Sequence, residues 1–252
     1  MPADRDTVLV IGGSDSSGGA GIARDLRTLS DHGMHGVAVI TAVTAQTHAE
    51  VRGVHHVPPE FIGAQIAAAL ASNAVRAIKI GMLGTARAVA AVAENLPREG
   101  LPIVLDPVLA ASSGGCLLDD AGRAALVERI LPLSTLVTPN VPEAALLLGA
   151  PVTTEPATLT RYGIELLKLG PAAVLVKGGH GEGDEAVDLL LSKAGDAVTL
   201  SGPRLPGSLR GTGCALASAI AARLAGGHPL NLACREAKRY VARLFEHAIA
   251  SL

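Results

Sequence analysis

The segment before the last predicted helices combines a possible anion site with a reactive side chain. Residues 210–216 read Arg-Gly-Thr-Gly-Cys-Ala-Leu, and residues 215–225 form an alanine-rich stretch that is expected to be helical. The first N–H groups of a helix have no partner within it and lie at the positive end of the dipole, so they suit a phosphate. Gly211 and Gly213 would let the backbone approach such an anion, and Cys214 would lie in the first turn, where the dipole lowers the pKa of a thiol. The alternative is a glycine turn before a packed helix with a small buried cysteine.

A second glycine-rich segment, residues 12–21, follows the first apolar run and reads Gly-Gly-Ser-Asp-Ser-Ser-Gly-Gly-Ala-Gly. It has neither the GxGxxG spacing of dinucleotide-binding loops nor the GK[ST] ending of a P-loop, which excludes both classes. The helix that follows carries Asp25 one turn in, where its carboxylate could face the strand ends. A solvated aspartate that the helix dipole stabilises is the alternative.

Residues that could recognise an aromatic ring follow three further strands. Gln46 offers a donor and an acceptor together, which suits the edge of a heteroaromatic ring, although a glutamine in a surface loop is common. Met82, Val108 and Leu109 could form the walls of an apolar slot, but packing in the core would explain them equally well.

Two segments could serve a phosphate or a metal ion. Asn140 and Glu143, in Thr-Pro-Asn-Val-Pro-Glu, either form a capping box at a helix start or bind a phosphate oxygen and a Mg²⁺-bound water. Lys177 precedes two glycines at the end of a strand, as nucleotide phosphates require. Asp188 is interpreted as an ordinary polar residue of a strand.

The elements that must position these residues alternate between apolar strand-like runs and alanine- and leucine-rich stretches of helical length, the pattern of βαβ units around a mostly parallel sheet. We predict strands over 7–11, 36–43, 75–80, 103–105, 136–138 and 173–176, and helices over 22–31, 60–71, 87–95, 120–130, 143–148 and 158–169. A hairpin, 186–191 with 197–200 and a turn at 193–196, precedes the helix at Gly213 and a last helix over 230–249. No repeat or linker interrupts the chain, so we expect one domain, 1–252.

Composition excludes several classes of protein. The formal net charge is -2 and only 2 % of the residues are aromatic, so neither a nucleic-acid surface nor a membrane surface is expected to be a partner. The cysteines, Cys116, Cys214 and Cys234, form no zinc pattern and are an odd number, which favours a reducing compartment. Without a leader-like start or an apolar run of about 18 residues, a cytoplasmic location is expected.

In their order and spacing, the motifs GGSDSSGGAG with Asp25, TAQT, KIGML, DPV, TPNVPE, VKGGH and GTGC extend over nearly the whole chain. Together they resemble the hydroxymethylpyrimidine and phosphomethylpyrimidine kinases of thiamine biosynthesis, in the ribokinase-like superfamily. The resemblance implies a three-layer α/β/α fold with a mostly parallel central sheet, Mg²⁺ and ATP, and a homodimer. The implied reaction transfers the γ-phosphoryl group of ATP to 4-amino-5-hydroxymethyl-2-methylpyrimidine and then often to its monophosphate.

The resemblance also assigns roles to individual residues. It places the pyrimidine against Gly13, Asp25, Gln46, Met82 and Val108. The anion hole would be formed by Gly211, Thr212 and Gly213, with Cys214 as the base where sugar kinases of the superfamily have an aspartate. The nucleotide side would comprise Lys177, Asn140, Arg210 and Lys238, and the metal would be held through Glu143.

This chain departs from the family pattern at two cationic positions. Ser112 stands where a lysine is usual, and Arg210 stands where a histidine is common before GTGC. Since a monophosphate acceptor needs its charge to be neutralised, we hypothesise that Arg210 compensates for Ser112 in the second phosphorylation.

Two other functions are compatible with the same motifs. A pyridoxal or pyridoxine kinase of the same superfamily would act on a similar hydroxymethyl heteroaromatic compound. A non-catalytic pyrimidine sensor is the other alternative, although the presence of Cys214, Lys177 and Glu143 speaks against it.

Overall fold

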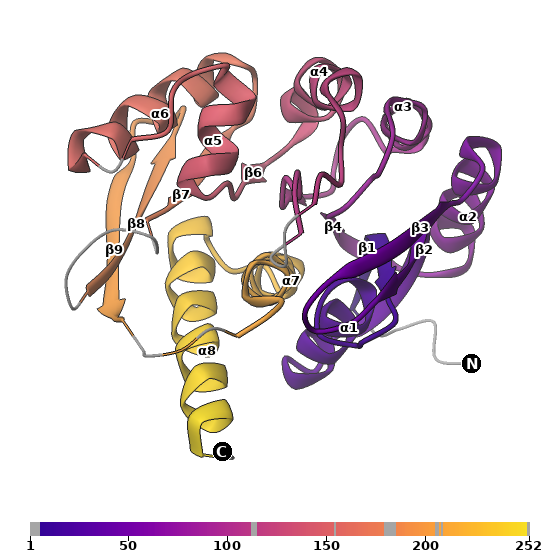
Figure 1. Cartoon of the computed structure of the whole chain (residues 1–252), viewed down its shortest axis with the longest axis horizontal. Helices are drawn as coiled ribbons and strands as arrows, with labels where there is room; N and C mark the ends of the chain where they lie inside the picture. Colours follow the sequence, from indigo (N-terminus) through magenta and orange to yellow (C-terminus); the bar gives the residue numbers. More distant parts are fainter. Residues whose placement is uncertain are drawn as a thin grey trace.

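A nine-stranded sheet forms the centre of the computed structural model, with the strand order β3-β2-β1-β4-β5-β6-β7-β8-β9 (Figure 1). The structure describes residues 6–111, 115–153, 155–178, 185–204, 207 and 209–250. The strands are β1 (Thr7–Asp15), β2 (His35–Gln46), β3 (Val51–His56), β4 (Val75–Ile80), β5 (Ile103–Leu105), β6 (Leu136–Val137), β7 (Ala173–Lys177), β8 (Glu185–Ser192) and β9 (Ala197–Pro203). Strands β2, β1, β4, β5, β6 and β7 pair in parallel, whereas β3, β8 and β9 pair antiparallel with their neighbours. The prediction of a mostly parallel sheet is therefore confirmed.

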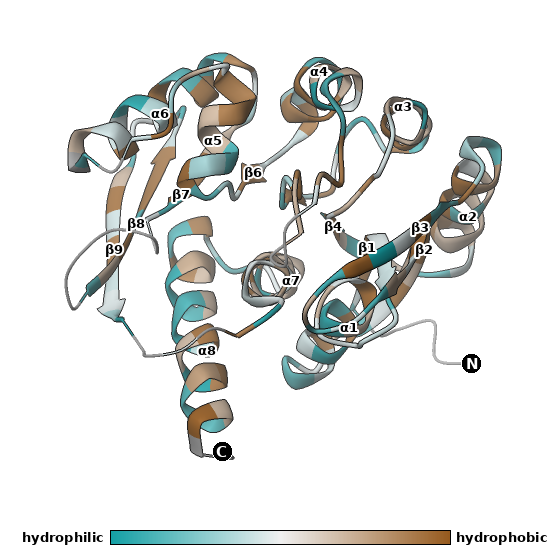
Figure 2. Ribbon diagram, viewed as in Figure 1, coloured by the Kyte–Doolittle hydropathy of each residue, from teal (hydrophilic) through white to brown (hydrophobic). Residues whose placement is uncertain are grey.

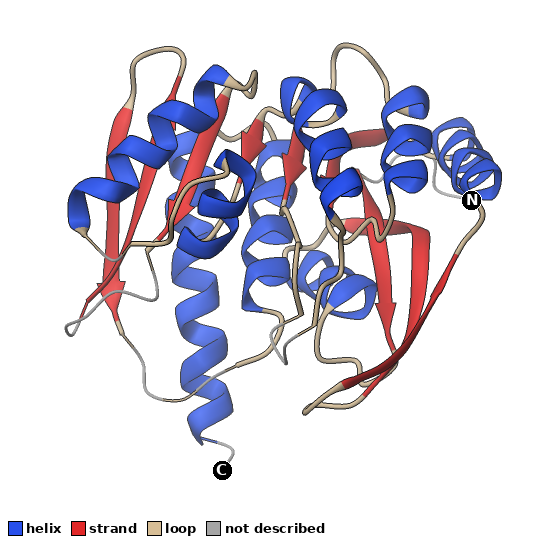
Figure 3. Ribbon diagram, turned by 45° about the horizontal axis from the view of Figure 1, so that its top comes forward, coloured by secondary structure: helices blue, strands red, loops and turns tan. Residues whose placement is uncertain are grey.

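Helices cover both faces of this sheet, which gives the three layers expected of the fold (Figures 1 and 3). They are α1 (Gly21–Asp31), α2 (Pro59–Ser72), α3 (Ala86–Asn95), α4 (Asp120–Arg129), α5 (Val141–Leu148), α6 (Pro156–Lys168), α7 (Thr212–Ala225) and α8 (Leu230–Ala250), with a short 3-10 turn, η1 (Leu131–Leu133). Helices α2 to α6 lie on one face, and α1, α7 and α8 lie on the other. No helix within the described residues has the length and apolar composition needed to cross a membrane.

The period-two geometry of the strands divides the core into two apolar layers. Leu9 and Ile11 of β1 pack toward α2 to α6, while Val8 and Val10 of the same strand pack toward α1, α7 and α8. All four side chains are fully buried. The helices contain both hydrophobic and hydrophilic residues, which alternate along α6 and α8 in Figure 2. Burial on both faces explains why the central strands are continuous apolar runs.

The main departure from the predicted elements is a β2–β3 hairpin at the edge of the sheet. Strand β2 continues to Gln46, beyond the predicted end at Val43, and pairs with β3, which was not predicted. Strand β3 is exposed along nearly its whole length and has no apolar alternation, so the sequence carries no periodic signal for it. Figure 3 shows this hairpin extending past the helices. Elsewhere the predicted elements are found, mostly with small shifts at their ends.

Candidate active site

The candidate site lies where the carboxyl ends of the parallel strands meet the first turn of α7. In open α/β sheets this edge is the usual place for a ligand, because loops rather than backbone ladders end there. Lys177 ends β7 and Asp106 directly follows β5. A methyl group added to Gly213 would lie 3.3 Å from Lys177 Nζ and 3.4 Å from Asp106 Oδ2. These two charged side chains therefore lie against the first turn of α7.

The start of α7 has the backbone geometry of an anion cradle. Gly211 is the N-cap, with a left-handed φ of 75°. The N–H of Ala215 donates to the Gly211 carbonyl at 2.9 Å, so the N–H groups of Thr212, Gly213 and Cys214 precede the first bond of the helix. The helix begins at Thr212, ahead of the alanine-rich stretch 215–225, which places Cys214 in its first turn as expected.

Replacing Gly211 with alanine is expected to lower both stability and activity. The left-handed φ alone costs about 1–2 kcal/mol for a residue with a side chain, and the added methyl group would overlap the Gly19 carbonyl oxygen. Gly149→Ala is the matched control, because Gly149 has a similar φ of 62° with no atom within 4 Å of the added methyl. In urea unfolding, Gly211→Ala should lose clearly more stability than Gly149→Ala, and only Gly211→Ala should lose turnover. Equal losses of stability and normal turnover would contradict the close approach of residues 19 and 211.

A lysine between two carboxylates forms the charged part of the site. Lys177 Nζ lies 3.1 Å from Asp106 Oδ1 and 3.8 Å from Glu143 Oε2. Burial lowers the pKa of Lys177, but the two carboxylates outweigh it and the pKa is raised. Burial raises the pKa of Glu143, and Lys177 opposes that shift only in part. Lys177 thus remains a cation beside the α7 start.

Asn140 and Glu143 form the capping box that was one of their two interpretations. Asn140 Oδ1 accepts the Glu143 N–H at 2.8 Å, and Glu143 Oε2 accepts the Asn140 N–H at 2.7 Å. The box fixes the start of α5 and directs the Glu143 carboxylate toward Lys177. That Glu143 also holds a metal ion stays a prediction.

The prediction of a low pKa for Cys214 is wrong. The pKa of the thiol is raised to about 11, mainly by burial and to a smaller extent by the carboxylates of Asp25 and Asp106, although Lys79 lowers it. The dipole of α7 acts on this thiol, as the sequence suggests, but desolvation and two nearby negative charges outweigh it. Cys214 is therefore a neutral thiol near pH 7.

Asp25 lies under the site rather than in it. Its side chain is 0 % exposed and both of its oxygens are 2.9 Å from Lys79 Nζ. Oδ1 also accepts a hydrogen bond from Ser218 Oγ of α7 at 2.8 Å. The expectation that Asp25 binds the pyrimidine is corrected, because the carboxylate points into the core between β4 and α7. Its partner Lys79 is close enough to Cys214 to lower the pKa of the thiol.

Among the residues predicted to contact the ring, two are brought into contact. A methyl group added to Gly13 would lie 2.8 Å from Met82 Sδ, and Met82 is 9 % exposed. Val108 is half-buried two residues after Asp106. Gln46 is held at the end of β2, where its Oε1 accepts from Thr44 Oγ1 at 3.2 Å.

Arg210 and Lys238 are both bound to carboxylates. Arg210 Nη2 lies 3.2 Å from Asp15 Oδ2, and Lys238 Nζ lies 2.7 Å from Asp188 Oδ2. Asp188 is buried and also accepts the Gly178 N–H at 3.1 Å, directly after β7. It therefore holds the backbone there in place, which corrects its interpretation as an ordinary polar residue of a strand. The assignment of these two cations to the nucleotide stays a prediction, because Lys177 is paired with a carboxylate in the same way. Ser112 and residues 179–180 lie outside the described residues.

Three charged side chains at or next to the site were not assigned from the sequence. Asp106 is in the quoted DPV motif, Lys79 is a lysine within a buried strand, and Asp15 is in the first glycine-rich loop. A charged residue inside an apolar strand, such as Lys79, predicts a buried ion pair, because a buried charge requires a partner. The partner's identity could not be read locally, since Lys79 and Asp25 are 54 positions apart.

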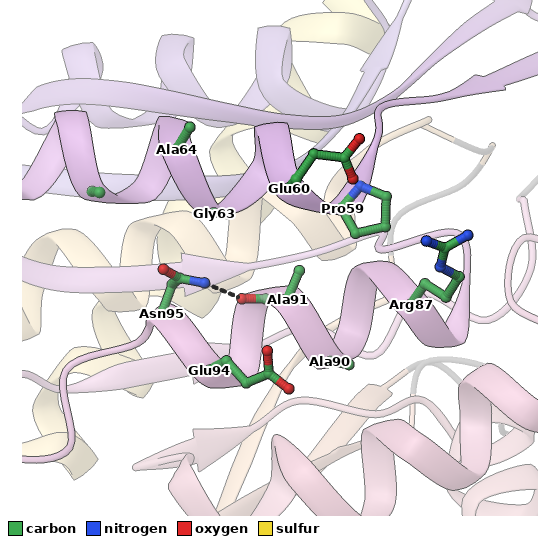
Figure 4. A pocket seen from close by; sticks show the side chains of 10 residues that line it. Pro59, Glu60, Gly63, Ala64, Arg87, Ala90, Ala91, Glu94 and Asn95 are labelled. Atoms are coloured by element: carbon green, nitrogen blue, oxygen red, sulfur yellow. Dashed lines mark hydrogen bonds between the residues drawn. The ribbon is translucent and has the colours of Figure 1, made fainter.

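A separate groove of about 500 Å³ lies on the surface between α2 and α3 (Figure 4). Alanines, Gly63 and Pro59 line it together with Glu60, Arg87, Glu94 and Asn95. The Asn95 side chain is bonded to the Ala91 carbonyl within the wall, at 2.9 Å. The groove shares no residue with the strand-end site.

Comparisons with known proteins agree with this geometry. The family model described as phosphomethylpyrimidine kinase matches residues 15–251. The hydroxymethylpyrimidine/phosphomethylpyrimidine kinase of Rhizobium meliloti (strain 1021) is 45 % identical over 92 % of this chain and 88 % of that protein. The crystal structure of phosphomethylpyrimidine kinase from Clostridium difficile 630 superposes with a TM-score of 0.81 at 37 % identity, covering 94 % of this chain and 98 % of that one.

The pyridoxal kinase from Staphylococcus aureus in complex with AMP-PCP is also similar, with a TM-score of 0.85 at 30 % identity over 94 % of this chain and 86 % of that one. Both solved structures have the fold described above. With the match extending from the first glycine-rich loop to the last helix, this chain belongs to the phosphomethylpyrimidine kinase family.

Proposed function

We propose that this protein transfers the γ-phosphoryl group of ATP to the hydroxymethyl oxygen of 4-amino-5-hydroxymethyl-2-methylpyrimidine, and then phosphorylates the monophosphate to the diphosphate, for thiamine diphosphate biosynthesis. The observation that carries the proposal is the meeting of Lys177 and Asp106 with the glycine-rich start of α7. That arrangement combines an anion cradle with a fixed cation, which is what phosphoryl transfer requires. The names of the relatives supply the acceptor class.

The chemistry can be assigned to groups of this chain. The acceptor hydroxyl oxygen forms a bond to the γ-phosphorus as the bond to the β,γ-bridging oxygen breaks and ADP leaves. The hydroxyl proton passes to Cys214 Sγ in the small fraction of molecules in which this side chain is a thiolate, because its pKa is raised to about 11. The N–H groups of Thr212, Gly213 and Cys214, together with Lys177, stabilise the charge on the transferring group. Gly13, Met82 and Val108 would contact the ring, and Gln46 would recognise its polar edge.

The residues present fit a magnesium ion. Asp106 and Glu143 offer hard carboxylate oxygens within 4 Å of Lys177 Nζ. Within the described residues there is no cluster of three or more His, Cys, Asp and Glu side chains, whereas Mg²⁺ commonly uses one or two carboxylates together with water and phosphate oxygens. When bound, the ion would neutralise charge on the phosphates of the nucleotide. Glu143 and Asp106 would hold it, and the Asn140 amide would donate to a phosphate.

Product analysis tests this proposal directly. After incubation with Mg-ATP and hydroxymethylpyrimidine, we expect the monophosphate first and then the diphosphate, with one ADP released per phosphate added. Mass spectrometry of the pyrimidine products separates the two steps. If the pyrimidine is never phosphorylated, the whole proposal is wrong. If only the monophosphate forms, the proposed second phosphorylation is wrong.

Pyridoxal is a second candidate acceptor, because the S. aureus pyridoxal kinase superposes at least as well as the pyrimidine kinase structure. The same assay with pyridoxal as the acceptor decides between them through the ratio of kcat/KM values. We propose a higher value for the pyrimidine, since the matching family model and the more identical relatives are pyrimidine kinases.

We further propose that residues 1–252 form one kinase domain, which acts in the cytoplasm as a homodimer. The continuous sheet from β3 to β9 supports a single domain. The dimer rests on the family resemblance, and light scattering on a sizing column would measure the mass directly.

A further inference from the structure

We infer that Arg210 is a positioning residue that fixes the loop carrying Gln46 relative to the anion cradle of α7. We call the group formed by Arg210, Asp15, Ser17 and Thr47 the Arg210 clamp. The inference rests on the proposed function for the identity of the acceptor, while the contacts that carry it stand by themselves.

The guanidinium of Arg210 joins three segments that are distant in the sequence. Nη1 donates to Ser17 Oγ at 3.0 Å and to the Thr47 carbonyl at 2.9 Å, and Nη2 donates to Asp15 Oδ2 at 3.2 Å. Ser17 belongs to the loop after β1, and Thr47 begins the turn between β2 and β3. The Arg210 side chain is 17 % exposed and that of Asp15 is 5 % exposed, so solvent screens this pair less than a surface pair.

Asp15 makes the loop side of the clamp rigid. Its Oδ1 accepts from the N–H and the hydroxyl of Ser17, both at 2.8 Å, and its Oδ2 accepts the Ala20 N–H at 3.0 Å. Each carboxylate oxygen thus holds part of the loop while Oδ2 also binds Arg210. The loop cannot shift without breaking several charge-assisted hydrogen bonds.

The clamp places the two ends of the acceptor site in a fixed relation. Arg210 is joined directly to Gly211, the N-cap of the cradle, and binds Thr47, the residue next to Gln46. Ser16 completes the link, because its Oγ accepts the Gln46 N–H at 2.8 Å and donates to the Gln46 carbonyl at 2.9 Å. A ring held by Gln46 and a hydroxymethyl group presented to Cys214 therefore depend on the same guanidinium. Nothing in this set of contacts reaches Lys177 or the capping box of α5.

An arginine is suited to this task because its planar fork can serve several acceptors at once, whereas a lysine presents one ammonium. Arg210→Ala should therefore lower kcat/KM for the acceptor by about ten-fold or more, and Arg210→Lys should recover part of that loss through the pair with Asp15. The KM for ATP should stay within about two-fold, since the clamp contacts neither Lys177 nor Asn140.

The experiment compares Arg210→Ala, Arg210→Lys, Asp15→Ala and the double variant Arg210→Ala with Asp15→Ala in the full chain. Arg52→Ala is the matched control, because Arg52 is a cation of the same hairpin whose pair with Glu50 is exposed. Steady-state kinetics give kcat and both KM values. Hydrogen exchange measured by mass spectrometry follows residues 44–50, with β8 and β9 as an internal reference for intact folding.

We expect the double variant to be no worse than the more impaired single variant, because two residues that act as one unit are not additive. Exchange over residues 44–50 should be about ten-fold faster in Arg210→Ala and unchanged in Arg52→Ala, with β8 and β9 unaffected. Additive losses, equal changes in the KM values of ATP and acceptor, or unchanged exchange would overturn the clamp. Failure of the wild-type protein to phosphorylate the pyrimidine would refute the proposed function. The exchange data would still show whether Arg210 holds residues 44–50 in place.

Discussion

Cys214→Ala is expected to lower kcat by about 100-fold or more and to leave the acceptor KM within about two-fold. A general base contributes about 10² to 10⁴ in rate and acts in the transition state, so its loss affects kcat more than binding. Because the pKa of the thiol is raised to about 11, only a small fraction is thiolate at neutral pH. The wild-type kcat should therefore rise close to ten-fold per pH unit between about pH 7 and 10.

Two variants make this result specific. Cys214→Ser keeps a similar shape but cannot ionise in this range, so it should lose both the activity and the pH dependence. Cys116→Ala removes an exposed thiol and should behave as the wild type. A Cys214→Ala enzyme with normal turnover, or a flat pH profile in the wild type, would reduce Cys214 to a packing residue.

Lys79→Met is expected to lower the free energy of unfolding by about 3–5 kcal/mol, the usual cost of leaving one partner of a buried ion pair uncompensated. Lys79 and Asp25 are 1 % and 0 % exposed, so water cannot replace the missing ammonium. Burial already raises the pKa of Asp25 in spite of Lys79, and removal of the cation would raise it further. A carboxyl group with a raised folded-state pKa costs stability above its unfolded pKa, so the loss should shrink as the pH falls from 7 toward 4.

Urea unfolding at several pH values measures this effect. The double variant Lys79→Met with Asp25→Asn removes the unpaired charge and keeps an acceptor for Ser218, so it should recover a large part of the loss. Arg52→Ala, which breaks an exposed pair, should change stability by less than about 1 kcal/mol. A loss of similar size for Lys79→Met and Arg52→Ala, or one that does not depend on pH, would show that Asp25 is not left as a buried charge.

The same ion pair connects stability with catalysis. Lys79 lowers the pKa of Cys214 against the effect of burial and of two carboxylates. Without Lys79, the pKa of the thiol should rise and the pH profile of kcat should move toward higher pH. The buried pair is therefore positioned to tune the base as well as to join α1, β4 and α7.

Local patterns were sufficient for most of the fold. Apolar runs such as β4 and β7 are strands because both faces of a parallel sheet are covered, and the chain shows this as continuous hydrophobicity. The capping box at Asn140 and the glycines before α7 are also local rules, which act over three or four residues. The edge strand β3 was not found because an exposed strand needs no apolar face.

By itself, the sequence determined the order of the elements, the strand ends at Asp106 and Lys177, the glycines at the start of α7, and the family to which the motifs belong. Only the tertiary structure decided the charge state of Cys214, the burial of Asp25 against Lys79, and the partners of Arg210. These properties depend on desolvation and on charges brought together from positions up to 195 residues apart. The spacing of residues along the chain predicts neither the desolvation of a group nor its charged neighbours. Burial and long-range pairing exist only once the sheet and its helices have assembled.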